Sequence, residues 1–205
     1  MKAAAKRAYH QEARAQQTEV TAREIITATV RLVRSVRRVS GITLEDIATE
    51  AGLTVRTILR RFRSRDGVLE SALVQLRREV EAARPATPPG DVEGALDALL
   101  EHYEDIGDLN IRALEEEDQL PSLHALLELA RDSHRGWLRH IFGPQLVVLS
   151  PAEREQRITA LYAATDVYLW KLLRRDLKLS RKEAAATFRR LVYGALETKT
   201  KREGV

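Results

Sequence analysis

The stretch TLEDIATEAGLTVRTILRRF, residues 43–62, carries the clearest local signals in the chain. Thr43 followed three positions later by Asp46 is a pattern that begins a helix, because each side chain can bond a free backbone N–H. The next apolar residues fall at the spacing of one helical face: Leu44, Ile47, Ala48 and Ala51. Gly52 stands where a helix ends in a left-handed residue, since glycine has no Cβ to clash. The stretch therefore predicts a short helix that ends in a tight turn.

A second short helix follows that turn. Thr54 can cap its start, and Ile58 and Phe62 can anchor it to the first helix. This spacing is typical of a helix-turn-helix, whose second helix lies in the DNA major groove. Its outward positions are Arg56, Thr57, Arg60 and Arg61. Arginine can bridge guanine O6 and N7 or hold a phosphate, and threonine can contact a base edge. The alternative is an ordinary helical hairpin with a solvated basic face.

Flanking residues extend the pattern on both sides of the hairpin. They are the apolar helix positions Ile25, Ile26, Thr29, Val33 and Val36, then Ser64-Arg65-Asp66 opening a further helix through Leu69 and Leu73. Together, residues 20–73 resemble the DNA-binding domain of the TetR family of bacterial transcriptional regulators. The resemblance implies an all-α protein, with an N-terminal three-helix helix-turn-helix DNA-binding domain and a C-terminal helical ligand-binding and dimerisation domain. We assign residues 19–66 to the first domain and 67–205 to the second.

The resemblance, combined with the outward face of the second helix, gives a set of expected DNA contacts. They are Thr43, Thr54, Val55, Arg56, Thr57, Arg60, Arg61 and Arg65. We expect Arg56, Thr57 and Arg60 to read bases, and Arg61 and Arg65 to hold phosphates. Val55 is ambiguous, because it also flanks the apolar face of its helix.

Several positions depart from the family pattern. Family members often have glycine at the position of Arg56, tyrosine at that of Leu59, histidine at that of Arg61 and lysine at that of Arg65. Leu59 cannot donate a hydrogen bond to phosphate, whereas Arg61 and Arg65 keep a cationic donor. We therefore expect the family fold with an unusual operator sequence.

Composition and charge fit this interpretation. Hydrophobic residues make up 44% and charged residues 31% of the 205 positions, as in a globular rather than a disordered protein. Residues 1–90 hold 17 Lys or Arg against 10 Asp or Glu, a net charge of +7, whereas residues 91–205 hold 17 against 20, a net charge of −3. Basic charge thus accompanies the proposed DNA-binding half, although a membrane surface would attract it equally.

The N-terminal residues and the cysteine content bear on location. Residues 1–18 are polar and basic, and we expect a flexible arm that either only solubilises the chain or adds phosphate contacts through Lys2, Lys6, Arg7 and Arg14. They lack the apolar core of a signal peptide, and no apolar run is long enough to span a membrane. Cysteine is absent, which excludes disulfides and thiol chemistry. These features predict a cytoplasmic protein without a membrane association.

The rest of the chain has helical periodicity and no alternating strand pattern. The Pro- and Gly-rich residues 84–91 interrupt it. Beyond them the expected helices are 92–106, 109–118, Pro121 to Gly143-Pro144, Pro151 to about Leu177, and 181 to about 200. The acidic run at 115–118 suggests a solvated helix end rather than a metal site, because consecutive helical positions point in different directions.

The last two helices predict a dimer. The helix from Pro151 has two apolar stripes, and if one stripe faces the core, the other needs a cover. A four-helix bundle with a second copy of the chain would supply the cover, and the resemblance implies the same homodimer. The expected interface residues are Leu161, Thr165, Tyr168, Leu172, Phe188, Leu191, Val192 and Ala195.

No sequence motif indicates an enzyme. There is no Gly-rich phosphate loop, no G-x-S-x-G elbow and no H-E-x-x-H pair, so we expect neither catalytic residues nor a metal or cofactor. The resemblance implies instead a small-molecule effector held by apolar walls with a few polar groups. Candidates are Tyr103, His124, Trp137, Tyr162, Asp166 and Trp170. Asp166 lies among apolar positions, where its carboxylate needs a partner, either a cationic ligand or an Arg or Tyr from a neighbouring helix.

These inferences lead to one functional hypothesis and one rival. The hypothesis is a homodimeric repressor that is released from a palindromic double-stranded DNA operator by the effector. The rival is a helical DNA-binding module that is regulated by a protein partner and has no small-molecule effector. A second domain without a cavity would favour the rival.

Overall fold

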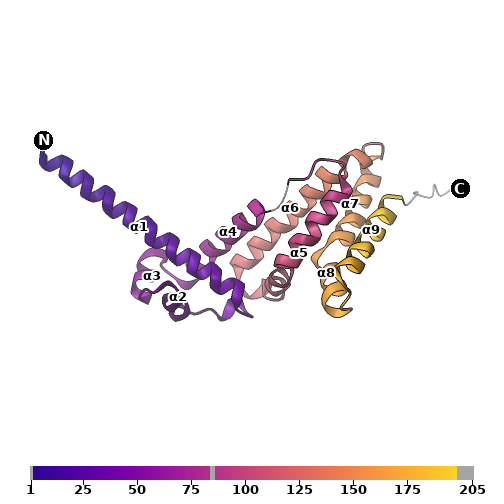
Figure 1. Ribbon diagram of the computed structural model, residues 1–205. Coiled ribbons are helices and arrows are strands. Elements are labelled where there is room, and N and C mark those ends of the chain that lie inside the picture. Colours follow the sequence, from indigo (N-terminus) through magenta and orange to yellow (C-terminus); the bar gives the residue numbers. More distant parts are fainter. Residues whose placement is uncertain (1, 84–85, 198–205) are drawn as a thin grey trace. The chain divides into compact units, whose positions relative to one another are not determined.

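The computed structural model describes the backbone of residues 2–83 and 86–197, and side chains from residue 16 onward within those ranges. The described part is helical with no strand, which confirms the all-α fold class. Figure 1 shows the order of the helices. The chain divides into two compact units, which we call the first unit (residues 1–81 and 116–126) and the second unit (residues 82–115 and 127–205).

The first unit contains the helices around the quoted stretch. They are α1 (Lys2–Ser35), the 3-10 turn η1 (Val39–Gly41), α2 (Leu44–Ala51), α3 (Val55–Phe62), α4 (Arg65–Ala83), the 3-10 turn η2 (Glu117–Gln119) and the start of α6 (Pro121–Leu146). Helix α1 begins well before the expected Thr21 and ends before Arg38. The side chains of Lys2, Lys6, Arg7 and Arg14 lie outside the described residues, so their phosphate contacts stay a prediction.

Buried apolar residues on each helix form the core of the first unit. They include Ile25, Ala28 and Val33 of α1, Ile47 of α2, Ile58 of α3, and Val68, Leu69 and Ala72 of α4. Two ion pairs add to this packing. Arg31 of α1 lies 2.7 Å from Glu50 of α2, and Arg34 of α1 lies 3.6 Å from Glu79 of α4. The short helices α2 and α3 are thus held against longer ones.

A buried carboxylate anchors the turn that precedes α2. Glu116 is only 3% exposed, and its two oxygens accept hydrogen bonds from the backbone N–H groups of Val39 (2.9 Å) and Ser40 (2.8 Å). The expected solvated acidic helix end is therefore wrong for Glu116, although its neighbours Glu115 and Asp118 are exposed. The carboxylate tolerates burial because charge-assisted bonds to two N–H groups replace water.

The second unit contains α5 (Val92–Glu115), the rest of α6, α7 (Pro151–Thr165), α8 (Val167–Lys171), the π-helical turn η3 (Leu172–Asp176) and α9 (Arg181–Glu197). The two helices expected at 92–106 and 109–118 are one continuous helix, α5. Helix α6 also continues past Gly143 and Pro144 to Leu146, because a proline in the last turn removes only one backbone hydrogen bond.

The long helix expected from Pro151 to Leu177 is broken at Asp166. Ser150 and Glu153 form a capping box that starts α7, which ends at Thr165. Asp166 is extended (φ −73°, ψ 152°), and its carboxylate accepts a 2.9 Å hydrogen bond from the N–H of Tyr168. This bond caps the start of α8. An aspartate that caps a new helix explains the break.

Two apolar clusters form the core of the second unit. One joins α5, α6, α7 and α9 through residues such as Leu96, Phe142, Leu161 and Val192. The other joins α5, α8, η3 and α9 through Leu99, Trp170, Leu173 and Phe188. The positions that meet show that α9 runs antiparallel to α7 and α8, as Figure 1 also shows.

Candidate nucleic-acid interface and candidate ligand cavity

Local hydrogen bonds fix the start and the end of α2 as the sequence predicts. The Thr43 hydroxyl accepts a hydrogen bond from the Asp46 N–H (3.1 Å), and the Asp46 carboxylate accepts one from the Thr43 N–H (2.8 Å). These bonds to the Thr43 backbone and side chain lower the pKa of Asp46. Gly52 has φ 65°, so it is left-handed as expected. The exit direction of the chain toward α3 is therefore determined locally.

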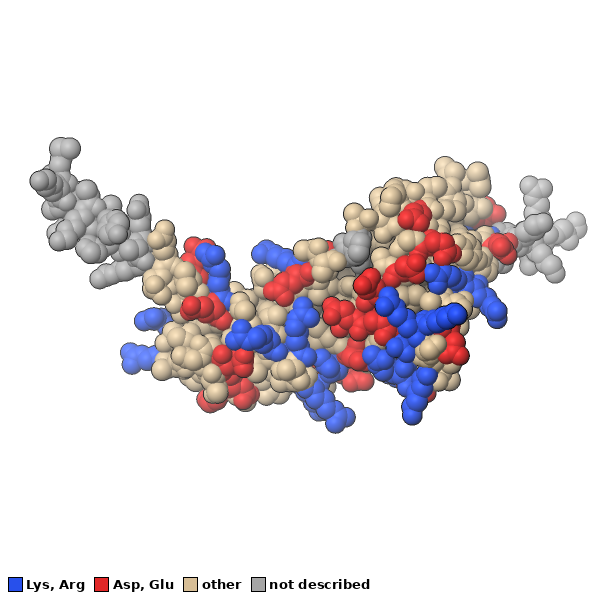
Figure 2. Space-filling model, in the orientation of Figure 1, with Lys and Arg blue, Asp and Glu red and all other residues tan. Residues whose placement is uncertain are grey.

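Helix α3 has one buried side and one basic side. The Thr54 hydroxyl accepts a hydrogen bond from the Thr57 N–H (3.3 Å), and Ile58 is completely buried. The expected DNA contacts Arg56, Arg60 and Arg61 are exposed, and their guanidinium groups make no hydrogen bond or ion pair with any described residue. Figure 2 shows Lys and Arg side chains projecting at the surface over α3.

The other expected DNA contacts are partly buried or already hydrogen-bonded within the chain. Val55 and Thr57 are half-buried, and the hydroxyls of Thr57 and Thr54 lie 3.0 Å apart. The Thr43 hydroxyl also donates to Asp46 (2.7 Å). Arg65 donates to the carbonyl oxygen of Ser40 (3.1 Å) and forms an ion pair with Asp66 at 3.2 Å. Its guanidinium thus joins α4 to η1, and the expected phosphate contact of Arg65 stays a prediction.

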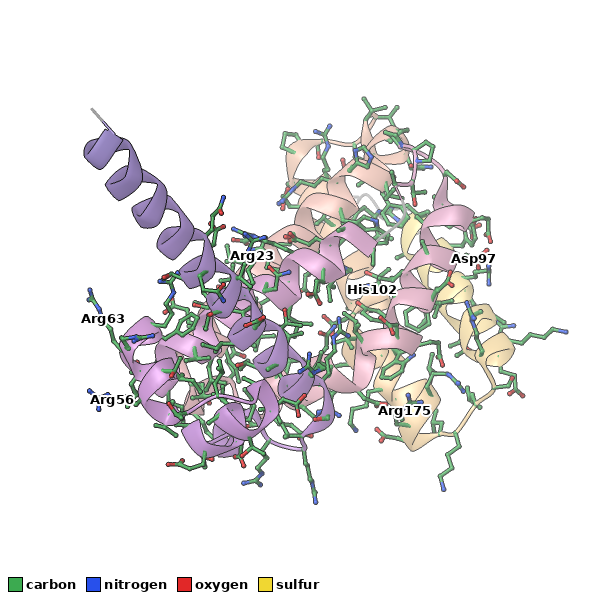
Figure 3. The ribbon with its side chains drawn as sticks, turned by 60° about the vertical axis from the view of Figure 1, so that its left-hand side comes forward. Arg23, Arg56, Arg63, Asp97, His102 and Arg175 are labelled. Atoms are coloured by element: carbon green, nitrogen blue, oxygen red, sulfur yellow. The ribbon has the colours of Figure 1, made fainter. Side chains whose placement is uncertain are left out.

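One basic residue at this surface was missed by sequence reasoning. Arg63 directly follows α3, is exposed and has a positive φ of 67°. Figure 3 shows Arg56 and Arg63 projecting from the protein on the same side. No sequence signal marks Arg63, because a left-handed position is normally recognised by a glycine or an asparagine.

The second unit contains a cavity of about 540 Å³ next to the break between α7 and α8. Its polar lining residues are His102, Tyr103, Asn110, Arg131, His134, Tyr162, Asp166 and Tyr168. The apolar lining residues include Leu114, Leu127 and Val167. The cavity therefore combines apolar walls with polar groups from α5, α6, α7 and α8, as small-molecule sites do.

Hydrogen bonds hold the cavity wall in place. Because α7 ends at Thr165, the carbonyl oxygen of Thr165 accepts a hydrogen bond from the Tyr103 hydroxyl (2.9 Å). The Thr165 hydroxyl donates to the carbonyl oxygen of Leu161 (2.7 Å) and lies 3.0 Å from Nε2 of His134. Since that hydroxyl proton is already used, Nε2 of His134 carries the proton of the second bond.

The charges at the cavity are unevenly compensated. Arg131 forms a 2.7 Å ion pair with Glu128. Asp166 is half-buried, and the only hydrogen bond of its carboxylate within the described chain comes from the Tyr168 N–H. Burial raises the pKa of Asp166, and the Tyr168 hydrogen bond and the charge of Arg131 oppose that shift. Burial also raises the pKa of Tyr162.

The structure brings three of the six expected ligand residues to this cavity: Tyr103, Tyr162 and Asp166. His124 is exposed and lies 3.2 Å from Glu117. Trp137 packs against the apolar core, with its ring stacked on His134. Trp170 is completely buried, and its Nε1 donates to Glu104 (2.9 Å). Neither tryptophan lines the cavity, because core packing takes up both rings. The cavity also contains four polar residues that were not predicted from the sequence: His102, Asn110, Arg131 and His134.

An ion-pair network joins α5 to the π-helical turn η3. Arg174 donates to both oxygens of Glu104 (2.6 and 2.9 Å), and Arg175 donates to both oxygens of Asp108 (2.8 and 2.9 Å). Arg174 and, to a lesser degree, Trp170 lower the pKa of Glu104 to about 2. The wider π-helical turn lets two consecutive arginines reach two acids that are one turn apart on α5.

The expected dimer residues separate into two groups. Leu161, Thr165, Phe188 and Val192 are completely buried inside their own chain and have no surface to offer to a second copy. Their assignment to the interface is therefore wrong, because the stripe of α7 that contains Leu161 and Thr165 faces the core of the second unit, as do Phe188 and Val192 of α9. Tyr168 (58%), Leu172 (46%) and Leu191 (43%) are exposed, and Ala195 is half-buried.

The fold and the α2–α3 geometry define a helical protein that contains a helix-turn-helix and a second helical unit. Residues 25–72 match the family model described as bacterial regulatory proteins, tetR family. The match covers the helix-turn-helix and supports membership of this family, and it indicates a TetR-type DNA-binding transcriptional regulator. A search of curated proteins found no match. No helix in the described part is long and apolar enough to cross a membrane, and the described side chains form no group that could hold a metal ion.

Proposed function

We propose that this regulator is a homodimeric repressor that acts in the cytoplasm on a palindromic operator and is released by a small-molecule effector. In this proposal, residues 19–66 contact DNA, and residues 67–205 bind the effector and dimerise. The observation that carries the proposal is the exposed, unpaired set Arg56, Arg60 and Arg61 on a helix whose other side is fixed by Ile58. In a symmetric pair, two such helices would reach half-sites about one helical turn apart.

The operator contacts are testable without knowing the operator. Selection of bound duplexes from a random pool should return a palindrome. The Arg60→Ala variant should lose about 1–3 kcal/mol of binding free energy for the selected sequence and relax its specificity, because Arg60 is assigned to a base. Arg139→Ala in the second unit is the matched control and should bind as the wild type does. A pool with no enriched sequence would contradict the proposal.

The exposed apolar residues support a dimer. Tyr168, Leu172 and Leu191 lie on α8, η3 and α9, the elements at the C-terminal end of the chain. Covering them with the same surface of a second copy would remove apolar area from water. Sedimentation should give a dimer for the wild type and a monomer for Leu191→Asp. The matched variant Val148→Asp, at a residue that is 85% exposed in the α6–α7 connection, should remain a dimer.

The cavity favours a small-molecule effector over the rival regulation by a protein partner. Its volume of about 540 Å³ is in the range of ligand sites. Because Glu128 compensates Arg131 but no described cation pairs with Asp166, the cavity should prefer ligands that present a positive or hydrogen-bond-donating group to Asp166. Asp166→Asn keeps the helix cap and removes the charge, so it should weaken binding of cationic compounds in calorimetry while leaving neutral ones unaffected.

Release from DNA would follow from unequal binding of the effector to two conformations. An effector shifts the population only by the difference between its affinities for the two states. Helix α5 supplies cavity residues up to Leu114, and two residues later Glu116 bonds the turn before α2. The chain itself thus connects the cavity wall to the helix-turn-helix, which supports coupling between the two sites.

A further inference from the structure

The connection between α3 and α4 is a strained turn centred on Arg63. Arg63 has φ 67° and ψ −35°, and the Ser64 N–H donates a 2.8 Å hydrogen bond to the carbonyl oxygen of Phe62. A hydrogen bond between residues two apart defines a γ-turn, and the form with positive φ at its centre is rare and strained. An L-residue with a side chain is disfavoured there, because its Cβ crowds the backbone.

Close packing on the α4 side leaves the turn little freedom. A Cβ on Gly67 would come within 2.6 Å of the Phe62 carbonyl oxygen, so that oxygen lies directly against α4. The Ser64 hydroxyl also accepts a hydrogen bond from the Gly67 N–H (3.1 Å), which caps the start of α4. These contacts impose positive φ at residue 63 whatever its side chain, and glycine would satisfy them with the least strain.

The Arg63 side chain does nothing for the fold that would explain its presence at this position. It is exposed, and its guanidinium makes no hydrogen bond or ion pair with any described residue. Arg60 and Arg61 lie within three residues of it and are equally unpaired, so mutual repulsion opposes their grouping in the free protein. Arg65, in contrast, is bonded to Ser40 and Asp66. Strain and uncompensated charge at one exposed residue together indicate an external anionic partner.

We propose that Arg63 holds a DNA backbone phosphate at the C-terminal end of α3. The proposal rests on the DNA-binding function and adds a contact that is not part of the recognition helix itself. Arg63 projects on the same side as Arg56 (Figure 3), so a duplex that meets α3 lies within reach of both. A phosphate is the expected target because the side chain starts beyond the last turn of α3, and a guanidinium matches two phosphate oxygens.

The test uses two glycine substitutions that should act alike on stability and differently on DNA binding. Arg63→Gly and the control Lys178→Gly both replace an exposed non-glycine residue with positive φ (67° and 54°), and Lys178 lies in the second unit. Each should keep or raise the melting temperature, by roughly 2 °C, since glycine relieves the strained φ. Only Arg63→Gly should weaken binding to a mixed-sequence duplex, by about tenfold at low salt.

The salt dependence identifies the contact as a phosphate. The slope of log Kd against log salt should fall by about one for each copy of Arg63 that contacts the duplex. Arg63→Lys should restore most of the affinity. Arg63→Gln keeps the strained backbone of an L-residue but lacks the charge, and it should behave like the glycine variant in binding.

Three results would overturn the proposal. One is an Arg63→Gly or Arg63→Gln protein with unchanged affinity and salt slope, and another is an equal loss of affinity in Lys178→Gly. The third is a wild-type protein that binds no duplex at any salt concentration, which would overturn the DNA-binding function as well. The first two results leave that function intact, so the two failures are distinguishable.

Discussion

Two pairs of consecutive arginines have opposite surroundings in this molecule. Arg60 and Arg61 on α3 are exposed, and no described acid pairs with either. Arg174 and Arg175 in η3 each donate two hydrogen bonds to one carboxylate of α5, Glu104 and Asp108. The same residue type therefore stabilises the fold in one region and stays available to an outside partner in the other.

The difference indicates which arginines can bind DNA. A guanidinium that already has a carboxylate gains little from a phosphate, because the existing bonds must be exchanged. An unpaired guanidinium releases counterions from DNA on binding and loses no internal bond. The two pairs should accordingly respond oppositely to mutation, in stability for η3 and in DNA affinity for α3.

The largest expected effect is on stability at η3. Arg174→Met should lower the free energy of unfolding by about 3 kcal/mol, because it leaves the half-buried carboxylate of Glu104 with the Trp170 Nε1–H as its remaining side-chain donor. Arg60→Met, the matched change on α3, should stay within about 0.5 kcal/mol of the wild type. Urea unfolding measures both. Equal destabilisation of the two variants would contradict the contrast.

The packing of the Trp170 ring against α5 gives a second test of how tightly η3 and its neighbours are held. A Cβ on Gly107 of α5 would lie 2.4 Å from the Trp170 ring, so Gly107→Ala should destabilise by about 2 kcal/mol through overpacking. Gly136 of α6 has nothing within 4 Å of its Cβ position, and Gly136→Ala should stabilise by up to about 1 kcal/mol. Thermal unfolding of both variants should show a lower melting temperature for Gly107→Ala and a higher one for Gly136→Ala. A stabilised Gly107→Ala protein would rule out the tight Trp170 packing.

Of the two arginine pairs, only the one on α3 should affect DNA affinity. Arg61→Ala should weaken binding by about 1 kcal/mol for every duplex sequence and reduce the salt slope, because Arg61 is assigned to a phosphate. Arg175→Ala should leave affinity and slope unchanged, since its partner Asp108 is internal. Fluorescence anisotropy with duplexes of different sequence measures both. A loss restricted to one sequence would instead assign Arg61 to a base.

A further expected effect is a stability change that is confined to acid pH. The folded pKa of Glu104, about 2, lies below its usual 4.5, so the ion pair contributes fully above pH 4.5 and is lost as the pH falls toward 2. Unfolding free energy should decline over that range, and Glu104→Gln should show a shallower decline. If the unfolding free energy of both proteins declined equally with falling pH, Glu104 would not be responsible for the loss of stability in acid.

The sequence predicted the parts of the fold that depend on local signals. Caps at Thr43 and Thr54 and the left-handed Gly52 are decided by neighbours within a few residues, and each is confirmed. The cap at Asp166 uses the same chemistry but was missed, because the surrounding periodicity is continuous and an aspartate inside a helical pattern has no distinctive neighbour. The expected dimer residues on α7 and α9 were wrong for another reason, because periodicity alone does not tell which apolar stripe of a helix faces the core.

Long-range contacts were beyond the reach of sequence patterns. Glu116 bonds backbone groups more than 70 positions away, and nothing in the acidic run distinguishes it from Glu115. The cavity was foreseen only through Tyr103, Tyr162 and Asp166, since its other polar groups come from faces whose orientation depends on helix packing. The turn at Arg63 escaped prediction because its strain comes from α4 packing against Phe62.

The affinity of the wild-type protein for a mixed-sequence duplex, measured across a range of salt concentrations, tests most directly whether the unpaired arginines of α3 serve DNA. We expect tight binding at low salt, with log Kd rising linearly with log salt and a shallower slope when Arg60 and Arg61 are both replaced by alanine. Binding that is independent of salt, or a slope that the double replacement leaves unchanged, would contradict it.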